Sequence, residues 1–331
     1  MIAQLDNLYI KTRMWKLWPR LVGYGFFEGR PITTKGRWIN PLVFSFLALA
    51  KCFPFFRRVK KPIFIIGIGR SGTTVLGMVL SMHREVGYLN EPKAIWHSIY
   101  PFEDLIGNYC NFKANYRLTE KDVSSEHICK ANRLFGAYLT TSLSSRMVDK
   151  YPELIFRVPF VKKLFPDAKF LFLARNGWDT CSSIENWSER FGTNQKQKTC
   201  DWWGVDNRKW KLLVEQLVPE HEDLKPHQQE LYRFKNHRDM AALEWIISMR
   251  EGLSLLKRYP NDVLRVNFEQ LCRDSSECLQ QISGFSDLSL HDKKFFEYAK
   301  QKLKPVPTKA SFELHPTIRK PFVDTMLLLG Y

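Results

Sequence analysis

The stretch Ile65-Ile-Gly67-Ile-Gly69-Arg70-Ser71-Gly72-Thr73-Thr74 decides the fold of this 331-residue chain. It starts as the end of an apolar run over residues 61–67, passes through a glycine-rich loop and enters a segment with helical periodicity up to Met82. An uninterrupted apolar run of this length is typical of a parallel strand covered on both faces. The stretch therefore predicts a strand, a loop and a helix in direct succession.

A glycine-rich loop at the start of a helix can bind an anion. Backbone N–H groups in the first helical turn have no partner within the helix, and the helix dipole adds partial positive charge. Glycine allows the backbone to approach the anion closely, and an arginine adds a fixed, forked cation. The candidate ligands of a phosphate-like group are Gly69, Arg70, Ser71, Gly72, Thr73 and Thr74.

The loop departs from the Walker A pattern, G-x-x-x-x-G-K-[ST], at one position. Gly67 and Gly72 have the correct spacing, but Thr73 stands where the lysine should be. That lysine normally reaches the β- and γ-phosphates, so its absence argues against an ATPase, a GTPase or a kinase. A P-loop kinase or NTPase with an aberrant loop stays open as an alternative function.

Strands and helices alternate through the rest of the chain. Further strands are expected at residues 85–90, 154–158, 168–174 and 263–268. Helices are expected at residues 73–82, 178–190, 240–258, 269–282 and 291–304. This alternation predicts a P-loop-type three-layer α/β/α fold with a mainly parallel central sheet. The expected domain covers residues 61–331 and carries a polar, tryptophan-containing insertion at about 193–238, near the active site.

Residues 1–60 form a basic, aromatic N-terminal extension. The chain has 50 Lys and Arg against 34 acids, a net charge of +16, and residues 1–61 alone carry 12 of these cations and only two acids. Such a surplus favours anionic partners. Cations interleaved with Trp and Phe suit contact with an anionic membrane surface. Packing of the extension on the domain's own core is the alternative interpretation.

The sequence also lacks the signals of a transmembrane helix, a signal peptide, a metal site and a nucleic-acid recognition motif. The apolar run at 41–50 is shorter than the roughly 20 residues that span a bilayer, and the start of the chain does not resemble a signal peptide. Seven cysteines include no C-x-x-C pair, so the usual zinc signature is missing and no metal is expected. An odd cysteine count fits a reducing compartment, which predicts a cytoplasmic protein with peripheral membrane contact through residues 1–60. No recognition motif supports nucleic-acid binding, whereas a non-enzymatic membrane- or polyanion-binding protein stays open.

A second motif lies about 105 residues after the first. The apolar run 170–174 ends in Arg175-Asn-Gly-Trp-Asp179, and Ser183 follows the arginine by eight residues. An arginine at a strand end and a hydroxyl one turn into the next helix can hold one phosphate together. Taken alone, Arg175 could equally be a structural partner of Asp179.

Together the two motifs resemble those of the sulfotransferases that use 3′-phosphoadenosine 5′-phosphosulfate (PAPS). The stretch 68–74 looks like the 5′-phosphosulfate loop of the bacterial and Golgi-type branches, and Arg175 with Ser183 is similar to the 3′-phosphate element. The resemblance implies PAPS as co-substrate and transfer of its sulfuryl group to a hydroxyl or amine without a metal. A softer match over 264–271 puts Phe268 where the family has a tyrosine near the nucleotide, although core packing explains Phe268 equally well.

The resemblance also implies catalytic residues. Glu91, 21 residues after Arg70, is similar to the catalytic glutamate of the glycan-modifying and protein-tyrosine branches, and as a base it would need a pKa raised by burial. Pairing with Lys93 is the alternative role, and His97 is the second candidate base. The stretch 156–159 lacks the histidine of cytosolic members, which strengthens Glu91 as the base, and Arg157 in this stretch is expected to help hold the sulfuryl group.

Two further expectations concern the ligands. The resemblance implies a late basic contact to the 3′-phosphate, for which Lys302, Lys304 and Lys309 are candidates. The basic surface and a glutamate base favour a glycan or glycolipid as the acceptor.

Overall fold

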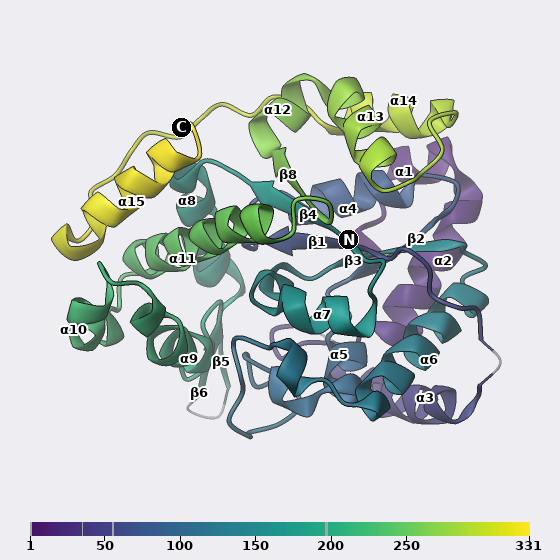
Figure 1. Cartoon of the computed structure of the whole chain (residues 1–331), viewed down its shortest axis with the longest axis horizontal. Helices are drawn as coiled ribbons and strands as arrows, with labels where there is room; N and C mark the ends of the chain where they lie inside the picture. Colours follow the sequence, from purple (N-terminus) through teal and green to yellow (C-terminus); the bar gives the residue numbers. More distant parts are fainter. Residues whose placement is uncertain (1, 35, 55, 196–197) are drawn as a thin grey trace.

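The computed structural model describes residues 2–34, 36–54, 56–195 and 198–331 and has a five-stranded parallel sheet at its centre (Figure 1). The strands run in the order β2-β3-β1-β4-β8, and every neighbouring pair is parallel. Their bounds are β1 Ile63–Gly67, β2 Val86–Asn90, β3 Arg146–Lys150, β4 Lys169–Ala174 and β8 Val263–Asn267. The predicted α/β class with a mainly parallel sheet is confirmed.

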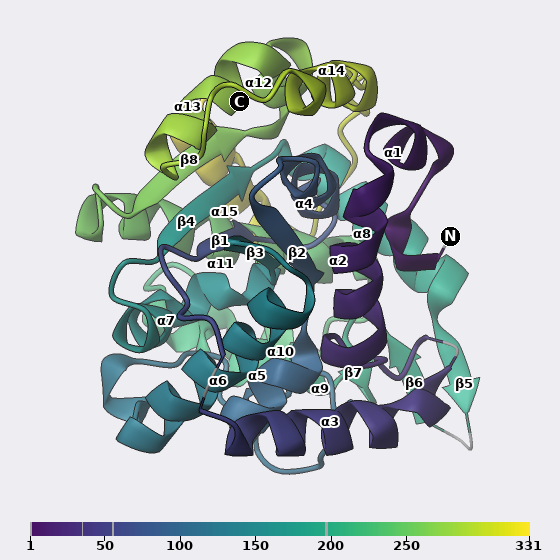
Figure 2. The ribbon, with the colours of Figure 1, turned by 90° about the vertical axis from the view of Figure 1, so that its right-hand side faces the viewer.

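The side chains of β1 alternate between two cores and so define the three layers. Ile63 and Ile65 belong to one apolar cluster, whereas Phe64 and Ile66 belong to the other. Successive side chains of a strand point to opposite faces, so each cluster lies between the sheet and one layer of helices. In Figure 2, α4 and α12–α14 lie above the sheet, and α5–α7 and α11 lie below it.

The helices of the domain follow the predicted pattern. The upper layer is α4 Thr73–Ser81, α12 Phe268–Arg273, α13 Ser275–Phe285 and α14 Lys293–Lys302. The lower layer contains α5 Lys93–Ile99, α6 Ser125–Thr141, α7 Val158–Leu164 and α11 His237–Arg258. α8 Gly177–Phe191 packs beside α11, and α15 Pro316–Leu328 packs on α11 near the end of the chain.

The prediction of a strand at residues 154–158 is wrong. Residues Pro152–Arg157 form a 3₁₀ helix, and the strand is β3, which precedes it. β3 reads Arg-Met-Val-Asp-Lys, yet all five residues are buried. Its charged side chains have partners distant in sequence: Arg146 donates to the carbonyl oxygens of Lys61, Ser286 and Asp287. A hydropathy pattern cannot show such partners, so it placed the strand in the apolar segment that follows.

The insertion at 193–238 folds into a small unit of its own. Its sheet is antiparallel and contains β5 Thr193–Gln195, β6 Lys198–Asp201 and β7 Gly204–Val205. The helices α9 Arg208–Gln216 and α10 Gln228–Tyr232 follow. Trp203 and Trp210 are buried and join the lower core, so these tryptophans fix the insertion to the domain.

The N-terminal extension packs on the domain through its inner side. It contains α1 Asn7–Thr12, α2 Leu17–Val22 and α3 Asn40–Cys52. Val43 and Leu47 of α3 are buried in the lower core, and Arg13 forms an ion pair with Asp292 beside α14. Within the described residues, none of the helices combines the length and apolar character that crossing a bilayer requires.

Candidate active site

The predicted anion loop lies where β1 ends and α4 begins. Gly72, the residue before α4, has φ 99°, a conformation that glycine adopts readily. A Cβ atom at Gly72 would lie 2.2 Å from the ring of Phe268, and one at Gly69 would lie 2.4 Å from Trp202. Both glycines are therefore needed for the close approach of an aromatic ring, and Gly72 is also needed for the turn. Ser71 stabilises the loop by donating its hydroxyl to the carbonyl of Ile68 at 2.6 Å.

The two sequence motifs meet at the carboxyl ends of β1 and β4. Arg70 Nε donates to Ser183 Oγ at 3.2 Å, and Arg175 Nη1 donates to the carbonyl of Arg70 at 3.1 Å. Arg175 also lies 3.9 Å from Asp179, while its Nε atom is buried without a hydrogen-bond partner in the structure. Partial burial and the charge of Arg175 lower the pKa of Arg70. Two neighbouring cations and an unpaired donor suit a bound anion.

A side cavity of about 210 Å³ extends from Arg175 between α12 and the segment after α14. Phe268 lines it, with its ring centroid 4.6 Å from the guanidinium carbon of Arg175. Lys309 contributes its backbone N–H, which donates to Asp179 at 2.7 Å, and its side chain is exposed. Lys302 is paired with Asp6 instead. The structure thus brings Phe268 and the backbone of Lys309 to the second motif.

A second cavity, of about 190 Å³, opens on the other side of the loop. Gly69, Arg70 and Thr74 line it from the loop. The remaining walls come from the N-terminal extension, from residues at and just after the ends of β2 and β3, from α5 and α8, from the loop at Ile106 and from the insertion: Pro31, Thr33, Thr34, Glu91, Lys93, Ile106, Lys150, Pro152, Glu153, Trp187, Asp201, Trp202 and Lys209.

Glu91 is held in this cavity by two lysines. It forms ion pairs with Lys150, at the end of β3, and with Lys93 at 3.3 Å. Burial by itself raises the pKa of Glu91, but the charges and hydrogen bonds of Lys150 and Lys93 lower it from 4.5 to about 2. The sequence predicts a raised pKa for a base at Glu91, whereas the pKa of Glu91 is lowered because its carboxylate is paired with two lysines. Its side chain keeps one third of its surface exposed, so a ligand can reach it.

Trp202 lines the same cavity as Glu91 and is held in place by a buried network. Its Nε1 donates to Glu244 Oε2 at 2.7 Å, and Lys209 Nζ pairs with Glu244 Oε1 at 2.6 Å. Lys209 and Glu244 are almost fully buried, and Lys209 Nζ lies 4.7 Å from the Trp202 ring centroid. Trp187 from α8 contacts Trp202 edge-on at 5.4 Å. The insertion therefore supplies a fixed aromatic wall to the cavity.

The chain matches the sulfotransferase family over residues 62–292, which is more than half of its length. It belongs to the sulfotransferase family. This member is 27% identical over 143 residues to protein-tyrosine sulfotransferase A of Caenorhabditis elegans, covering 39% of this chain and 34% of the relative. It is 30% identical over 125 residues to the Drosophila melanogaster protein-tyrosine sulfotransferase, covering 37% and 24%. The matches thus span about a third or less of these curated relatives.

A solved structure is also similar to this sulfotransferase-family chain. It is the sulfotransferase domain from the curacin biosynthetic pathway, with 14% identity, a TM-score of 0.46 and coverage of 83% of this chain and 99% of that domain.

Arg157 lies outside the cavity of this sulfotransferase-family member. Its guanidinium is 1% exposed, pairs with Glu103 at 3.1 Å and donates to the backbone carbonyls of Glu103, Asn115 and Tyr116. These bonds use its donors to hold the loop over residues 103–116 in place. Arg157 therefore supports a loop in this structure. The segment that contains it was expected to be a strand, but it is a 3₁₀ helix.

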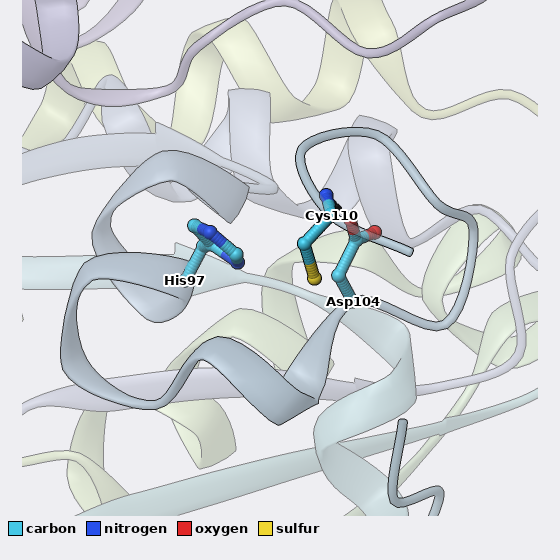
Figure 3. Close-up of side chains that lie close together, drawn as sticks. All are labelled: His97, Asp104 and Cys110. Carbon is cyan, nitrogen blue, oxygen red and sulfur yellow. Dashed lines mark hydrogen bonds between the residues drawn. The ribbon is translucent and has the colours of Figure 1, made fainter. Parts of the chain in front are cut away.

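His97 lies near Asp104 and Cys110, the one group among the described residues whose donor atoms could be combined for a metal (Figure 3). The carboxylate of Asp104 accepts backbone N–H bonds from Gly107, Asn108, Tyr109 and Cys110. Its oxygens are thus occupied in closing a loop. Burial lowers the pKa of His97, and His97 does not line the cavity that contains Glu91.

Sequence reasoning missed Lys150 and the wall formed by Trp202, Lys209 and Glu153. Lys150 was missed because β3 was placed in the wrong segment. The carboxyl ends of parallel strands meet at one edge of the sheet, so a lysine at the end of a correctly placed β3 would be expected near Glu91. Trp202 was noted only as part of the insertion, and no local pattern shows that it reaches Gly69.

Proposed function

We propose that this chain transfers a sulfuryl group from PAPS to an acceptor hydroxyl or amine. The observation that carries the proposal is the direct contact between the two motifs, Arg70 to Ser183 across 113 residues of sequence and Arg175 to Arg70 across 105. Sites for two anionic groups, one at the loop and one at Arg175, are what a nucleotide with a 5′-phosphosulfate and a 3′-phosphate requires.

The residues of the site fit such a nucleotide. The N–H groups of the loop and the start of α4 would bind the 5′-phosphosulfate, with Thr73 and Thr74 as hydroxyl donors. Arg175, whose Nε is unpaired, and Ser183 would bind the 3′-phosphate. The side cavity along Phe268 would take part of the nucleotide, and Lys309 lies at its edge.

The transfer itself is an in-line displacement at sulfur. A bond forms between the acceptor oxygen and sulfur while the bond from sulfur to the 5′-phosphate oxygen breaks, and 3′,5′-diphosphoadenosine leaves. Arg70 and Lys150 would stabilise the charge that develops on the sulfuryl and phosphate oxygens. Glu91 would accept the acceptor's proton.

The low pKa of Glu91 is compatible with this role once substrate binds. A phosphosulfate beside Lys150 and Lys93 would share their positive charge and place negative charge near Glu91. Both effects favour the protonated carboxyl group and raise its pKa. Binding of the phosphosulfate would therefore convert Glu91 from an ion-paired carboxylate in the free protein into a carboxylate that can accept the acceptor's proton.

The acceptor is proposed to be a sugar hydroxyl of a glycan or glycolipid. The support is the wall of Trp187 and Trp202, because flat rings stack well on a sugar face, together with the polar side chains of Asp201 and Glu153. A tyrosyl hydroxyl is the second candidate, since two relatives are protein-tyrosine sulfotransferases and the same wall suits a phenol ring.

Nucleotide binding tests the cofactor first. Calorimetry should show tight binding of 3′,5′-diphosphoadenosine and much weaker binding of ATP and 5′-AMP. A preference for ATP would favour the kinase or NTPase alternative, and no binding of any nucleotide would favour a membrane- or polyanion-binding protein. Labelled PAPS with a glycan panel and a tyrosine-peptide panel would then separate the two acceptor classes.

A further inference from the structure

The outer face of α3 carries no charged residue. Its exposed positions are Pro41, Leu42, Ser45, Ala48, Leu49 and Cys52, and its inner positions Val43, Leu47 and Ala50 are buried. Leu42 and Leu49 are 64% and 63% exposed. A helix on a soluble domain normally places charged or polar residues on this side. An apolar outer face indicates contact with a second apolar phase.

Neighbouring residues extend this surface. Trp38, which is 78% exposed, precedes α3, and the exposed Phe53 follows it. α2 lies on the same side of the molecule and adds the exposed Trp18 and Leu21 (Figure 2). We call Trp18, Leu21, Trp38, Leu42, Leu49 and Phe53 the α2–α3 face. Tryptophan at the border of an apolar surface is typical of residues at a membrane–water interface.

The charge of the N-terminal extension itself is mostly positive, although the exposed Glu126 of α6, which is paired with Lys130, also interacts with Lys51 of α3. Residues 1–61 contain only two acids, and both are paired: Glu28 with the buried Arg20, and Asp6 with Lys302. Exposed cations lie before and after α3, namely Arg37, Arg57 and Arg58. The extension therefore presents uncompensated positive charge beside an apolar surface, which is complementary to an anionic lipid headgroup layer.

We propose that the α2–α3 face binds the surface of an anionic phospholipid bilayer. α3 has 13 residues and a length of about 20 Å, shorter than the roughly 30 Å hydrocarbon core, so it lies in the membrane plane. Its leucines reach the boundary between headgroups and acyl chains, and the cations contact the headgroups. Trp38 follows the cavity-lining Thr34 by four residues, at most about 14 Å of chain, so the site opens near the membrane.

Vesicle co-sedimentation of the full chain tests this proposal without PAPS or acceptor, so its result is independent of the proposed function. Wild-type protein should bind phosphatidylcholine vesicles that contain 30% phosphatidylserine at least tenfold more tightly than pure phosphatidylcholine vesicles. The double variant Leu42→Glu/Leu49→Glu should lose about 25-fold in binding, because two added negative charges near the surface each cost about fivefold. The single variant Trp38→Ala should weaken binding by about threefold and keeps the test valid if the double variant does not fold.

The matched control is Leu327→Glu/Leu328→Glu on α15, at the opposite side of the molecule in Figure 1. These leucines are 66% and 65% exposed, so this variant has the same added charge and a similar loss of exposed apolar surface. It should bind vesicles like the wild type. Equal binding to neutral and anionic vesicles, no binding, or an equal loss in the control would overturn the proposal. A wild-type dimer in sedimentation equilibrium that Trp38→Ala dissociates would assign the face to self-association instead.

Discussion

The two cavities beside the loop are built in different ways. The side cavity at Arg175 is lined by three segments: the junction of β4 and α8, the helix α12 and residues 305–308 after α14. The cavity at Glu91 is assembled from the N-terminal extension, β2, α5, β3, α8 and the insertion. Both cavities form only after distant segments have packed, but the first uses three segments and the second uses more than three. Because the two cavities share no lining residue within the part of the chain that the structure describes, we expect that nucleotide binding and acceptor chemistry can be altered separately.

The largest expected effect is on the chemical step, which we assign to the cavity at Glu91 and not to the side cavity at Arg175. Glu91→Gln should lower turnover by about 10²–10⁴-fold, the usual contribution of a general base, and leave the affinity for 3′,5′-diphosphoadenosine within about twofold. Single-turnover rates and calorimetry measure the two quantities. Glu153→Gln, another carboxylate in the same cavity, is the matched control and should keep most of the single-turnover rate at saturating acceptor. Normal turnover of Glu91→Gln would remove Glu91 as the base.

The second effect concerns the side cavity. Arg175→Ala should weaken binding of 3′,5′-diphosphoadenosine about 10- to 100-fold, because hydrogen bonds to a charged group are lost. Binding of 5′-AMP, which lacks the 3′-phosphate, should change much less. Arg190→Ala, at the exposed end of α8, is the control. If both nucleotides lost affinity equally, Arg175 would be a structural partner of Asp179 and not a 3′-phosphate ligand.

The third effect concerns the aromatic wall. Trp202→Ala should raise the KM for the acceptor about tenfold with little change in kcat, because a large aromatic contact is removed while Glu91 and Lys150 stay in place. Trp38→Ala, far more exposed and outside the cavity wall, should not change the KM for a soluble acceptor. An unchanged KM in Trp202→Ala would show that the acceptor does not contact this wall.

The smallest effect is on stability against acid. The pKa of Glu91 is lowered from 4.5 to about 2 in the folded protein, so its ion pairs stabilise the fold above pH 4.5 and lose this contribution as the pH falls toward 2. Glu91→Gln should therefore narrow the difference in unfolding free energy between pH 5 and pH 2.5. Denaturant titrations at both pH values measure it. An identical difference in both proteins would mean that the lysine pairs do not form in solution.

Much of the fold follows from local sequence. The runs that form β1 and β4 are apolar because both faces of the sheet are covered at these strands, and the glycine-rich loop fixes where β1 passes into α4. β3 could not be predicted in this way, because Arg146, Asp149 and Lys150 are buried with partners distant in the sequence. Only packing brings those partners together.

The candidate site also combines features that the local sequence predicts with contacts that only packing creates. The sequence by itself predicted the anion loop and the second motif from residue types at fixed spacing, and it predicted Glu91 through the resemblance to sulfotransferases; the roles of these residues stay predictions. Only the tertiary structure decided that Lys150 and Lys93 hold Glu91, that Trp202 covers Gly69 and that Arg157 supports a loop. The physical reason is that hydrogen-bond geometry and backbone periodicity act locally, whereas charge pairing and ring packing depend on distances that exist only once the chain has folded.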